Sequence, residues 1–295
     1  MIYTCTTNPS LDYYISLPEL VLGKSNRTDT EMYEAGGKGV NVSIVLNNFH
    51  IPNIALGFLG GFPKEYYLSF IGDFPYIQPL FTSIKDNTRI NIKIMDDKIK
   101  TDINAKGPTI TDEEFAKFRT RLNNIYAGDY FILSGNIEEE IEDRIVQIIH
   151  ELSNDNVKII LDTDRHIIDK CLDTKIFAVK LNDQNIKDDI MKEGRYFIEK
   201  NVDYVIYSAP HKSSFIFTKN ETITCDNDPH SLINATGSSD SLLAGFVYGI
   251  MRAADTTESF KYANAAALAT SMTNDLASKE KIEELFDTIE VRSIS

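Results

Sequence analysis

The chain has 295 residues, of which 42% are hydrophobic, and its formal net charge at pH 7 is −14. A chain of this length buries a substantial core, and it is long enough for two domains or for one large α/β domain. The negative charge argues against nucleic acid as a partner, because phosphate backbones are bound by basic patches.

No apolar stretch reaches the roughly 18 residues that a membrane-spanning helix needs. The amino terminus lacks the basic and apolar regions of a secretory signal. We therefore expect a cytoplasmic protein with no membrane partner. Cys5, Cys171 and Cys225 are isolated, without metal-ligand spacing, and the histidines are scattered. This predicts reduced, buried thiols and no zinc site.

Short apolar runs alternate with helical patterns along the chain. We predict strands at residues 2–7, 54–59, 130–134, 157–162, 177–181 and 204–208. Helices are predicted at 38–49, 112–126, 139–152 and 188–200, the second with a capping box at Thr111. This alternation is typical of an α/β, three-layer αβα sandwich around a mostly parallel, doubly wound sheet. Residues 89–95 differ, because Ile90, Ile92 and Ile94 alternate with polar residues as in a half-exposed sheet.

Residues 234–241, Asn-Ala-Thr-Gly-Ser-Ser-Asp-Ser, precede an apolar run at helical spacing that predicts a buried helix. Its apolar members are Leu242, Leu243, Phe246, Val247, Ile250 and Met251. The unpaired N–H groups and the positive dipole end of a helix start are suited to hold an anion. Asp240 either caps this helix or takes a proton from a group bound beside it.

A second glycine cluster, Ala-Gly-Gly-Lys-Gly-Val-Asn-Val at residues 35–42, also opens a helix. Glycine permits close approach of the backbone to a ligand, and Lys38 supplies a cation suited to phosphate. The cluster is not a P-loop, because the first spacing and the hydroxyl after the lysine are missing. No Gly-x-Gly-x-x-Gly follows the first strand, so a Rossmann dinucleotide site is not expected.

Five further blocks stand between and around these clusters. They are Thr-Asn-Pro-Ser-Leu-Asp at 7–12, Gly-Phe-Leu-Gly-Gly at 57–61, Thr-Arg-Ile-Asn-Ile-Lys at 88–93, Asp-Ile-Asn-Ala-Lys-Gly-Pro at 102–108 and Ser-Gly at 134–135. In this order they resemble the PfkB (ribokinase-like) carbohydrate kinases over nearly the whole chain. The opening block and the Thr-Arg-Ile-Asn block resemble the 1-phosphofructokinase and tagatose-6-phosphate kinase branch.

The resemblance implies a single ribokinase-like domain, residues 1–295, with a small β-sheet lid from about 11–35 and 87–106. It implies ATP-dependent phosphorylation of a phosphosugar hydroxyl, with ATP and Mg²⁺ as cofactors. The phosphosugar would be fructose 1-phosphate, tagatose 6-phosphate or a similar compound. The alternating lid strand is a candidate surface for a homodimer, or it packs on its own domain.

The same resemblance assigns roles to individual residues. Asp240 matches the base that takes the sugar hydroxyl's proton, and the N–H groups of Gly237, Ser238 and Ser239 match an anion hole. On the substrate side, Asp12, Gly37 and Asn41 match residues that hold the sugar, and Lys38, Arg89 and Asn104 match residues near its phosphate. The nucleotide-side matches are Lys180, Asn182, Ser208, Gly237 and Asn264, and no residue is assigned as a metal ligand.

Each assignment has a purely structural alternative. Asp12 could be a turn residue, Arg89 a solvated lid residue, and Asp240 a plain helix cap. Lys38 could be a surface lysine, although a helix start disfavours a cation unless an anion lies nearby.

The chain departs from the family pattern on the nucleotide side. Ser239 replaces the second glycine of Gly-Ala-Gly-Asp, which would cost about 1–2 kcal/mol if that position were left-handed. Asn185 stands where the family has a metal-organising glutamate, and residues 207–212 replace Ser-Leu-Gly-x-x-Gly. These departures leave a second hypothesis open, a catalytically weakened relative that binds a sugar phosphate as a sensor or binding module.

Overall fold

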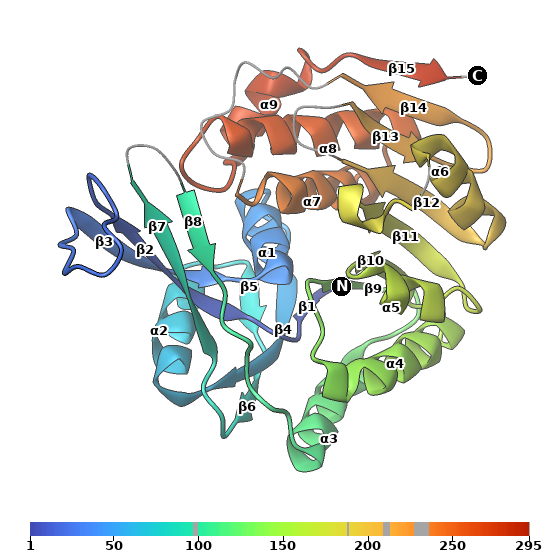
Figure 1. The fold of residues 1–295 in the computed structure, drawn as a ribbon. Coiled ribbons are helices and arrows are strands. Elements are labelled where there is room, and N and C mark those ends of the chain that lie inside the picture. Colours follow the sequence, from blue (N-terminus) through green and yellow to red (C-terminus); the bar gives the residue numbers. More distant parts are fainter. Residues whose placement is uncertain (97–99, 188, 209–212, 227–235, 295) are drawn as a thin grey trace.

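A large, twisted and mostly parallel sheet forms the centre of the protein (Figure 1). The computed structural model describes residues 1–96, 100–187, 189–208, 213–226 and 236–294. In spatial order the strands are β15 (Val291–Ile294), β14 (Thr222–Cys225), β13 (Ser214–Phe217), β12 (Val202–Tyr207), β11 (Ile176–Leu181), β10 (Lys158–Asp162), β9 (Tyr130–Ser134), β1 (Ile2–Thr6), β4 (Asn53–Gly60) and β5 (Ile77–Pro79), and β6 (Thr82–Ile84) also pairs with β4.

All six predicted parallel strands are present, with ends that differ by no more than two residues from the prediction. The strands from β12 to β5 pair in parallel. The antiparallel edge made of β13, β14 and β15 was not predicted. Its strands have four residues each, too few to show a clear period in the sequence.

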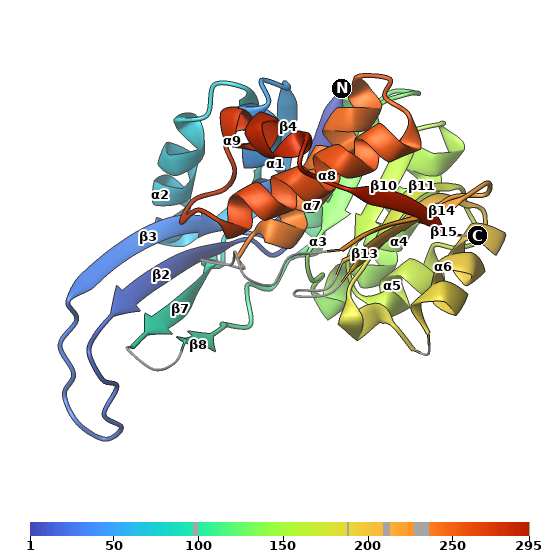
Figure 2. The same ribbon diagram turned by 90° about the horizontal axis from the view of Figure 1, so that it is seen from above.

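Helices cover both faces of the sheet, which makes the three layers that the alternation predicts (Figures 1 and 2). Strand β9 shows why: Tyr130 and Ile132 pack with one set of helices, and Phe131 and Leu133 pack with the other. The first set is α1 (Lys38–Asn48), α7 (Ser238–Met251), α8 (Thr256–Ser271) and α9 (Lys279–Phe286), and the second is α3 (Asp112–Arg121), α4 (Glu142–Asn154), α5 (Arg165–Lys170) and α6 (Ile190–Glu199). Helix α2 (Gly61–Gly72) packs beside β4 and β5.

Several predicted helix ends were wrong by one turn. The helix expected over 112–126 ends at Arg121 and continues as the 3₁₀ turn η1 (Leu122–Asn124). The helix expected from 139 begins as the 3₁₀ turn η2 (Glu139–Ile141) before α4. Tighter turns of this kind are common at helix ends. Helix α6 begins after its cap Asp189, and the predicted start at Asp188 lies outside the described residues. The capping box at Thr111 is confirmed.

The lid is a separate sheet with the order β3-β2-β7-β8, and Figure 2 shows it projecting from the main body. Its strands are β2 (Ser10–Ser16), β3 (Thr30–Gly36), β7 (Arg89–Met95) and β8 (Lys100–Ile103). Only three residues, Thr7, Asn8 and Pro9, separate β1 from β2, so the lid leaves the main sheet directly at the carboxyl end of a central strand.

The predicted buried helix α7 packs closely against α8 through two glycines. A Cβ at Gly245 would lie 2.4 Å from the carbonyl oxygen of Tyr262, and one at Gly249 would lie 2.5 Å from Cα of Ser259. Leu242, Leu243, Phe246 and Val247 are buried, but Met251 at the last turn is 43% exposed, so that part of the prediction was wrong. Among the described residues no helix is long and apolar enough to cross a membrane, and the three cysteines are buried and unbonded to one another.

We expect Gly245→Ala to lower the free energy of unfolding by about 1–3 kcal/mol, because the added methyl group would force α7 and α8 apart. Urea unfolding measures the loss. Gly72→Ala is the matched control, since Gly72 ends helix α2 and a Cβ there meets no atom within 4 Å. A Gly245→Ala protein as stable as the control would contradict this packing.

Candidate active site

A buried ion pair lies at the carboxyl ends of two neighbouring strands. Asp162 ends β10, Lys180 lies in β11, and their side chains are 2% and 0% exposed. The Lys180 Nζ donates to Asp162 Oδ1 at 3.0 Å. Lys38, the first residue of α1, places its Nζ 3.5 Å from the same oxygen. Asp162 Oδ2 is buried and has no hydrogen-bond partner among the described residues.

The two glycine clusters meet beside this pair. Asn41 in the first turn of α1 donates its Nδ2 to Oδ2 of Asp240, in the first turn of α7, at 2.7 Å. Asp240 is 5% exposed. Asn41 and Asp240 are 199 residues apart in the sequence, so only the fold joins the two predicted clusters.

The charged residues of this cluster shift one another's pKa values. Burial and the nearby charge of Asp162 raise the pKa of Asp240 to about 6, against the opposing effects of Lys180, Asn41 and Lys38. Burial alone would raise the pKa of Asp162, but Lys180 and Lys38 outweigh it and hold that pKa below its usual range. Burial likewise disfavours a charged Lys38, yet Asp162 and Asp240 raise its pKa. The cluster therefore holds one firmly ionised carboxylate and one carboxylate poised near neutral pH.

The start of α7 presents backbone donors beside Asp240. Gly237 caps the helix with a left-handed φ of 77°, and its carbonyl accepts from the N–H groups of Asp240 and Ser241. The Ser238 hydroxyl donates to the Ala267 carbonyl at 2.9 Å and so is engaged with α8. Ser239 lies in the helix and does not have a positive φ, so the backbone cost considered for that position does not arise. The first N–H groups of the helix have no intrahelical acceptor.

On the lid side, Asp12 is held in place by its neighbours. Its Oδ1 accepts from the Ser10 hydroxyl at 2.7 Å and from Asn91 Nδ2 at 2.8 Å. A Cβ at Gly36 would lie 2.7 Å from Asp12 Oδ2, so the glycine makes room for this carboxylate. Gly37 has a φ of 138°, which favours glycine, and a Cβ there would lie 2.8 Å from the Thr6 side chain.

Arg89 joins the lid to the main body. Its Nη2 donates to the Asn8 carbonyl at 3.0 Å and its Nη1 to the Ala105 carbonyl at 3.2 Å. Its Nε is buried, without a hydrogen-bond partner in the part of the chain that the structure describes. Asn104 is exposed and accepts from Lys93 at 3.2 Å. Lys38 lies with Asp162 and Asp240, whereas the carboxylates that act on Arg89 are Asp12 and Glu138, so the residues predicted near the phosphate fall into different groups.

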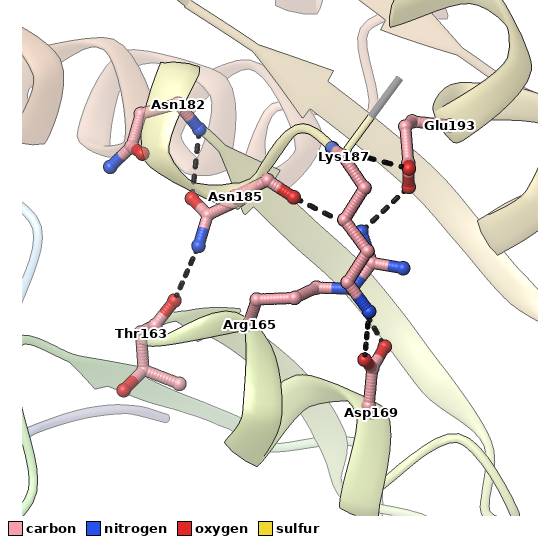
Figure 3. Close-up of polar contacts among 7 residues, drawn as sticks. All are labelled: Thr163, Arg165, Asp169, Asn182, Asn185, Lys187 and Glu193. Carbon is pink, nitrogen blue, oxygen red and sulfur yellow. Dashed lines mark hydrogen bonds and ion pairs between the residues drawn. The ribbon is translucent and has the colours of Figure 1, made fainter. Parts of the chain in front are cut away.

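The loop after β11 is closed by hydrogen bonds within the protein (Figure 3). Asn185 is 4% exposed; its Oδ1 accepts from the Asn182 N–H at 2.9 Å, and its Nδ2 donates to the Thr163 carbonyl at 3.2 Å. Arg165 Nη1 donates to the Asn185 carbonyl at 3.0 Å and to Glu193 at 2.6 Å. Asn185 therefore links the loop after β11 to the loop after β10.

The other predicted nucleotide-side residues are partly described. Asn264 is buried in α8, where its Oδ1 accepts from the Ser214 hydroxyl and its Nδ2 donates to the Phe260 carbonyl. Ser208 donates its N–H to the Leu181 carbonyl at 3.2 Å. The departures at Ala209, Pro210, His211 and Lys212, and the beginning of the last cluster at Asn234 and Ala235, lie outside the described residues.

Three polar residues of this region were not predicted as site residues: Asp162, Asn91 and Glu138. Asp162 ends a predicted strand, and Asn91 belongs to the Thr-Arg-Ile-Asn block, so position in a strand or block could have indicated both. Glu138 opens an acidic run, Glu138-Glu139-Glu140, which by itself is typical of a solvated surface.

We expect Lys180→Met to destabilise the fold by about 3–5 kcal/mol, because it leaves Asp162 buried with a weaker partner. The double variant Lys180→Met with Asp162→Asn should lose less, since no unpaired buried charge remains. Urea unfolding measures both. Lys175→Met is the control, because Lys175 forms an exposed pair with Asp203 and such pairs contribute little. Similar losses for the two lysine variants would contradict the role of the buried pair.

Comparison with known proteins agrees with this architecture. The chain is 31% identical to a 1-phosphofructokinase of Bacillus subtilis over 99% of both chains. It is 34% identical to a 1-phosphofructokinase of Borreliella burgdorferi over 100% of this chain and 99% of the relative. The structure of phosphofructokinase-2 from Escherichia coli in complex with substrates and products superimposes with a TM-score of 0.91, at 20% identity, over 98% of this chain and 99% of the other.

The sequence pattern that defines the pfkB family of carbohydrate kinases matches residues 6–280, which is most of the chain. The predicted ribokinase-like fold, a large mostly parallel sheet with a small separate one, is confirmed. The chain belongs to the pfkB family of carbohydrate kinases, in the branch of the 1-phosphofructokinases and tagatose-phosphate kinases, and is a phosphotransferase.

Proposed function

We propose that this protein transfers the γ-phosphoryl group of ATP to a hydroxyl of a phosphosugar, with Asp240 as the base. The observation that supports this most is the position of Asp240, a buried carboxylate with a pKa of about 6 in the first turn of α7. A base works best when its pKa lies near the operating pH.

The reaction needs an acceptor hydroxyl in line with the phosphoryl group and donors that stabilise the moving charge. The hydroxyl proton passes to Asp240 while its oxygen bonds to phosphorus and the bond from phosphorus to ADP breaks. The N–H groups of Gly237, Ser238 and Ser239 stabilise charge on the phosphoryl oxygens, each contributing about 3 kcal/mol in the transition state. Lys38, held at the same place by Asp162, adds a positive charge.

The donor atoms present fit a Mg²⁺ ion that enters with the nucleotide. Mg²⁺ usually keeps several waters and is bound by one or two carboxylates and the nucleotide's phosphates. Asp162 Oδ2, buried and unpartnered, is suited to accept a hydrogen bond from such a water. No group of three potential metal ligands occurs in the part of the chain that the structure describes. When bound, the ion would offset phosphate charge.

We propose that residues of the lid and of the start of α1 bind the sugar. Asp12, fixed by Ser10 and Asn91, accepts hydrogen bonds from sugar hydroxyls, and Gly37 allows the backbone to approach the sugar. Arg89 supplies positive charge for the phosphate that the sugar already carries. The relatives that this chain matches include 1-phosphofructokinases, a D-tagatose-1-phosphate kinase of Bacillus licheniformis and a tagatose-6-phosphate kinase of Staphylococcus epidermidis.

The test is a coupled assay of ADP release with fructose 1-phosphate, tagatose 6-phosphate and fructose 6-phosphate, with unphosphorylated fructose as the control. We expect turnover with at least one phosphosugar and little with fructose. A preference for the unphosphorylated sugar would contradict the phosphosugar assignment.

One observation favours a second candidate, a binding module of low activity. Both the oxygen and the nitrogen of the Asn185 side-chain amide form hydrogen bonds within the protein, and an amide lacks the negative charge with which a carboxylate attracts a metal ion. Calorimetry with ATP-Mg²⁺ and, separately, with each phosphosugar distinguishes the two candidates. Phosphosugar binding without nucleotide binding or turnover would support the second.

We also infer a homodimer formed through the lid. Tyr13 and Tyr33 stack at 4.4 Å between ring centroids, and Met32 and Tyr33 are 52% and 43% exposed on this projecting sheet. Sedimentation equilibrium should give twice the chain mass, and Tyr33→Lys should shift the protein towards the monomer. A wild-type monomer at all concentrations would contradict the dimer.

We expect Asp240→Asn to lower kcat by at least about 100-fold, because the base is lost, while phosphosugar affinity changes only a few-fold. The same variant should be more stable at pH 7. The folded-state pKa lies above the unfolded value, so ionising Asp240 costs folding free energy as pH rises through 4 to 6, on the order of 1–3 kcal/mol.

Steady-state kinetics and urea unfolding at pH 7 check both parts of this prediction. Asp275→Asn serves as the control, since Asp275 lies outside helix α7. If Asp240→Asn kept most of the turnover, Asp240 would not be the base and would only cap the helix.

A further inference from the structure

Arg165, the first residue of α5, is a nearly buried cation that no part of the proposed reaction uses. Its side chain is 12% exposed, and its Nε donates to Asp169 Oδ1 at 2.7 Å. Its Nη1 donates to Glu193 Oε2 at 2.6 Å and to the Asn185 carbonyl at 3.0 Å (Figure 3). The guanidinium carbon lies 4.6 Å from the ring centroid of Phe197 in α6. One side chain therefore ties α5 and α6 to the loop after β11.

The bond to Asn185 reaches the 3₁₀ turn η3 (Asp183–Asn185), which follows β11. Asn185 Oδ1 accepts from the Asn182 N–H at 2.9 Å, and its Nδ2 donates to the Thr163 carbonyl at 3.2 Å (Figure 3). An amide at this position lacks the charge by which a metal ion could fix the turn, so bonds within the protein must fix it. Without Arg165 the main chain of this turn would lose its bond to α5.

The loops after β10 and β11 adjoin residues on the nucleotide side of the proposed reaction. Asp162, whose Oδ2 is suited to a water of Mg²⁺, ends β10 directly before its loop. Lys180 donates to Asp162 Oδ1 at 3.0 Å, and Asn182 lies two residues after Lys180. We propose that Arg165 is a positioning residue for the nucleotide: by holding Asn185 it sets where Asp162 and Asn182 meet ATP-Mg²⁺. This inference rests on the proposed function and deepens it.

Neutralising the nearby carboxylates is a separate task, which an experiment can distinguish from positioning. Glu193 is 7% exposed and needs a cation, whereas the bond to the Asn185 carbonyl neutralises no charge. Asp169 has a second partner, because Lys187 Nζ lies 3.0 Å from its Oδ2. Replacing Arg165 by methionine and Glu193 by glutamine together would therefore remove the bond to Asn185 without leaving a buried carboxylate unpaired.

The experiment compares the double variant Arg165→Met with Glu193→Gln against Glu193→Gln alone, so that the two proteins differ only at residue 165. Calorimetry measures the affinity for ATP-Mg²⁺ and, separately, for fructose 1-phosphate or whichever phosphosugar the wild type phosphorylates. We expect the double variant to bind ATP-Mg²⁺ about 10- to 100-fold more weakly than Glu193→Gln does, and the phosphosugar equally well. The KM for ATP should rise in the same proportion, and the KM for the phosphosugar should not.

Arg119→Met is the matched control, because Arg119 pairs with Glu151 at 2.7 Å and the two side chains are 43% and 44% exposed. It should bind both ligands as the wild type does. Urea unfolding checks that each variant folds. Should the double variant fail to fold, Arg165→Lys still carries the test, since it keeps a charge beside both carboxylates but lacks the planar fork that also reaches Asn185. It should weaken binding of ATP-Mg²⁺ and leave phosphosugar binding unchanged.

Hydrogen exchange reports on the loop without any ligand. In the double variant the amide hydrogens of residues 182–187 should exchange faster than in Glu193→Gln, because the turn opens more readily. Exchange in α3, which lies outside this network, should be the same in both proteins.

Weaker binding of both ligands by the same factor would overturn the inference and indicate a general structural role for Arg165. So would a double variant that binds ATP-Mg²⁺ like Glu193→Gln, or one whose loop exchanges no faster. Any of these results in a wild type that phosphorylates a phosphosugar leaves the proposed function standing. A wild type that binds no ATP-Mg²⁺ and phosphorylates no phosphosugar overturns both.

Discussion

The ion pair between Asp162 and Lys180 is the interaction on which the rest of the site depends. It is buried at the ends of two central parallel strands, where neither charge is solvated, so each needs the other. Asp162 Oδ1 also lies 3.5 Å from Lys38 Nζ at the start of α1, and burial together with the charge of Asp162 raises the pKa of Asp240 at the start of α7. Asp162 thus acts on one titratable group at each helix start, while Lys180 lowers the pKa of Asp240.

The site lies where the parallel topology requires it. The carboxyl ends of β1, β9 and β10 lie side by side, and each end holds a buried polar atom without a hydrogen-bond partner among the described residues: Thr6 Oγ1, Ser134 Oγ and Asp162 Oδ2. Buried polar atoms are rarely left unpaired in folded proteins, and such a row along one sheet edge is suited to a polar ligand. The hydrogen bond between Asn41 and Asp240 closes the same edge from the helix side.

The two halves of the site are built differently. On the lid side, Arg89 Nε is buried and has no hydrogen-bond partner among the described residues. In the loop after β11, by contrast, polar groups are paired within the protein: Arg165 pairs with Glu193 and Asp169, and Asn185 donates to the Thr163 carbonyl in the loop after β10 (Figure 3). The loop that follows Lys180 is therefore positioned by bonds within the protein, without a carboxylate at residue 185.

The sequence by itself determined the fold class, the central strands and the two glycine-led helices, because apolar periodicity and glycine clusters are local properties of the chain. It also singled out Asp240 and Asn41, but as members of separate motifs. Only the tertiary structure decided that these two are hydrogen-bonded to each other, and that a buried Asp162 lies close enough to raise the pKa of Asp240. Contacts across many tens of residues depend on strand order, and burial turns an ordinary aspartate or glutamate into a perturbed one; neither can be seen in a local pattern.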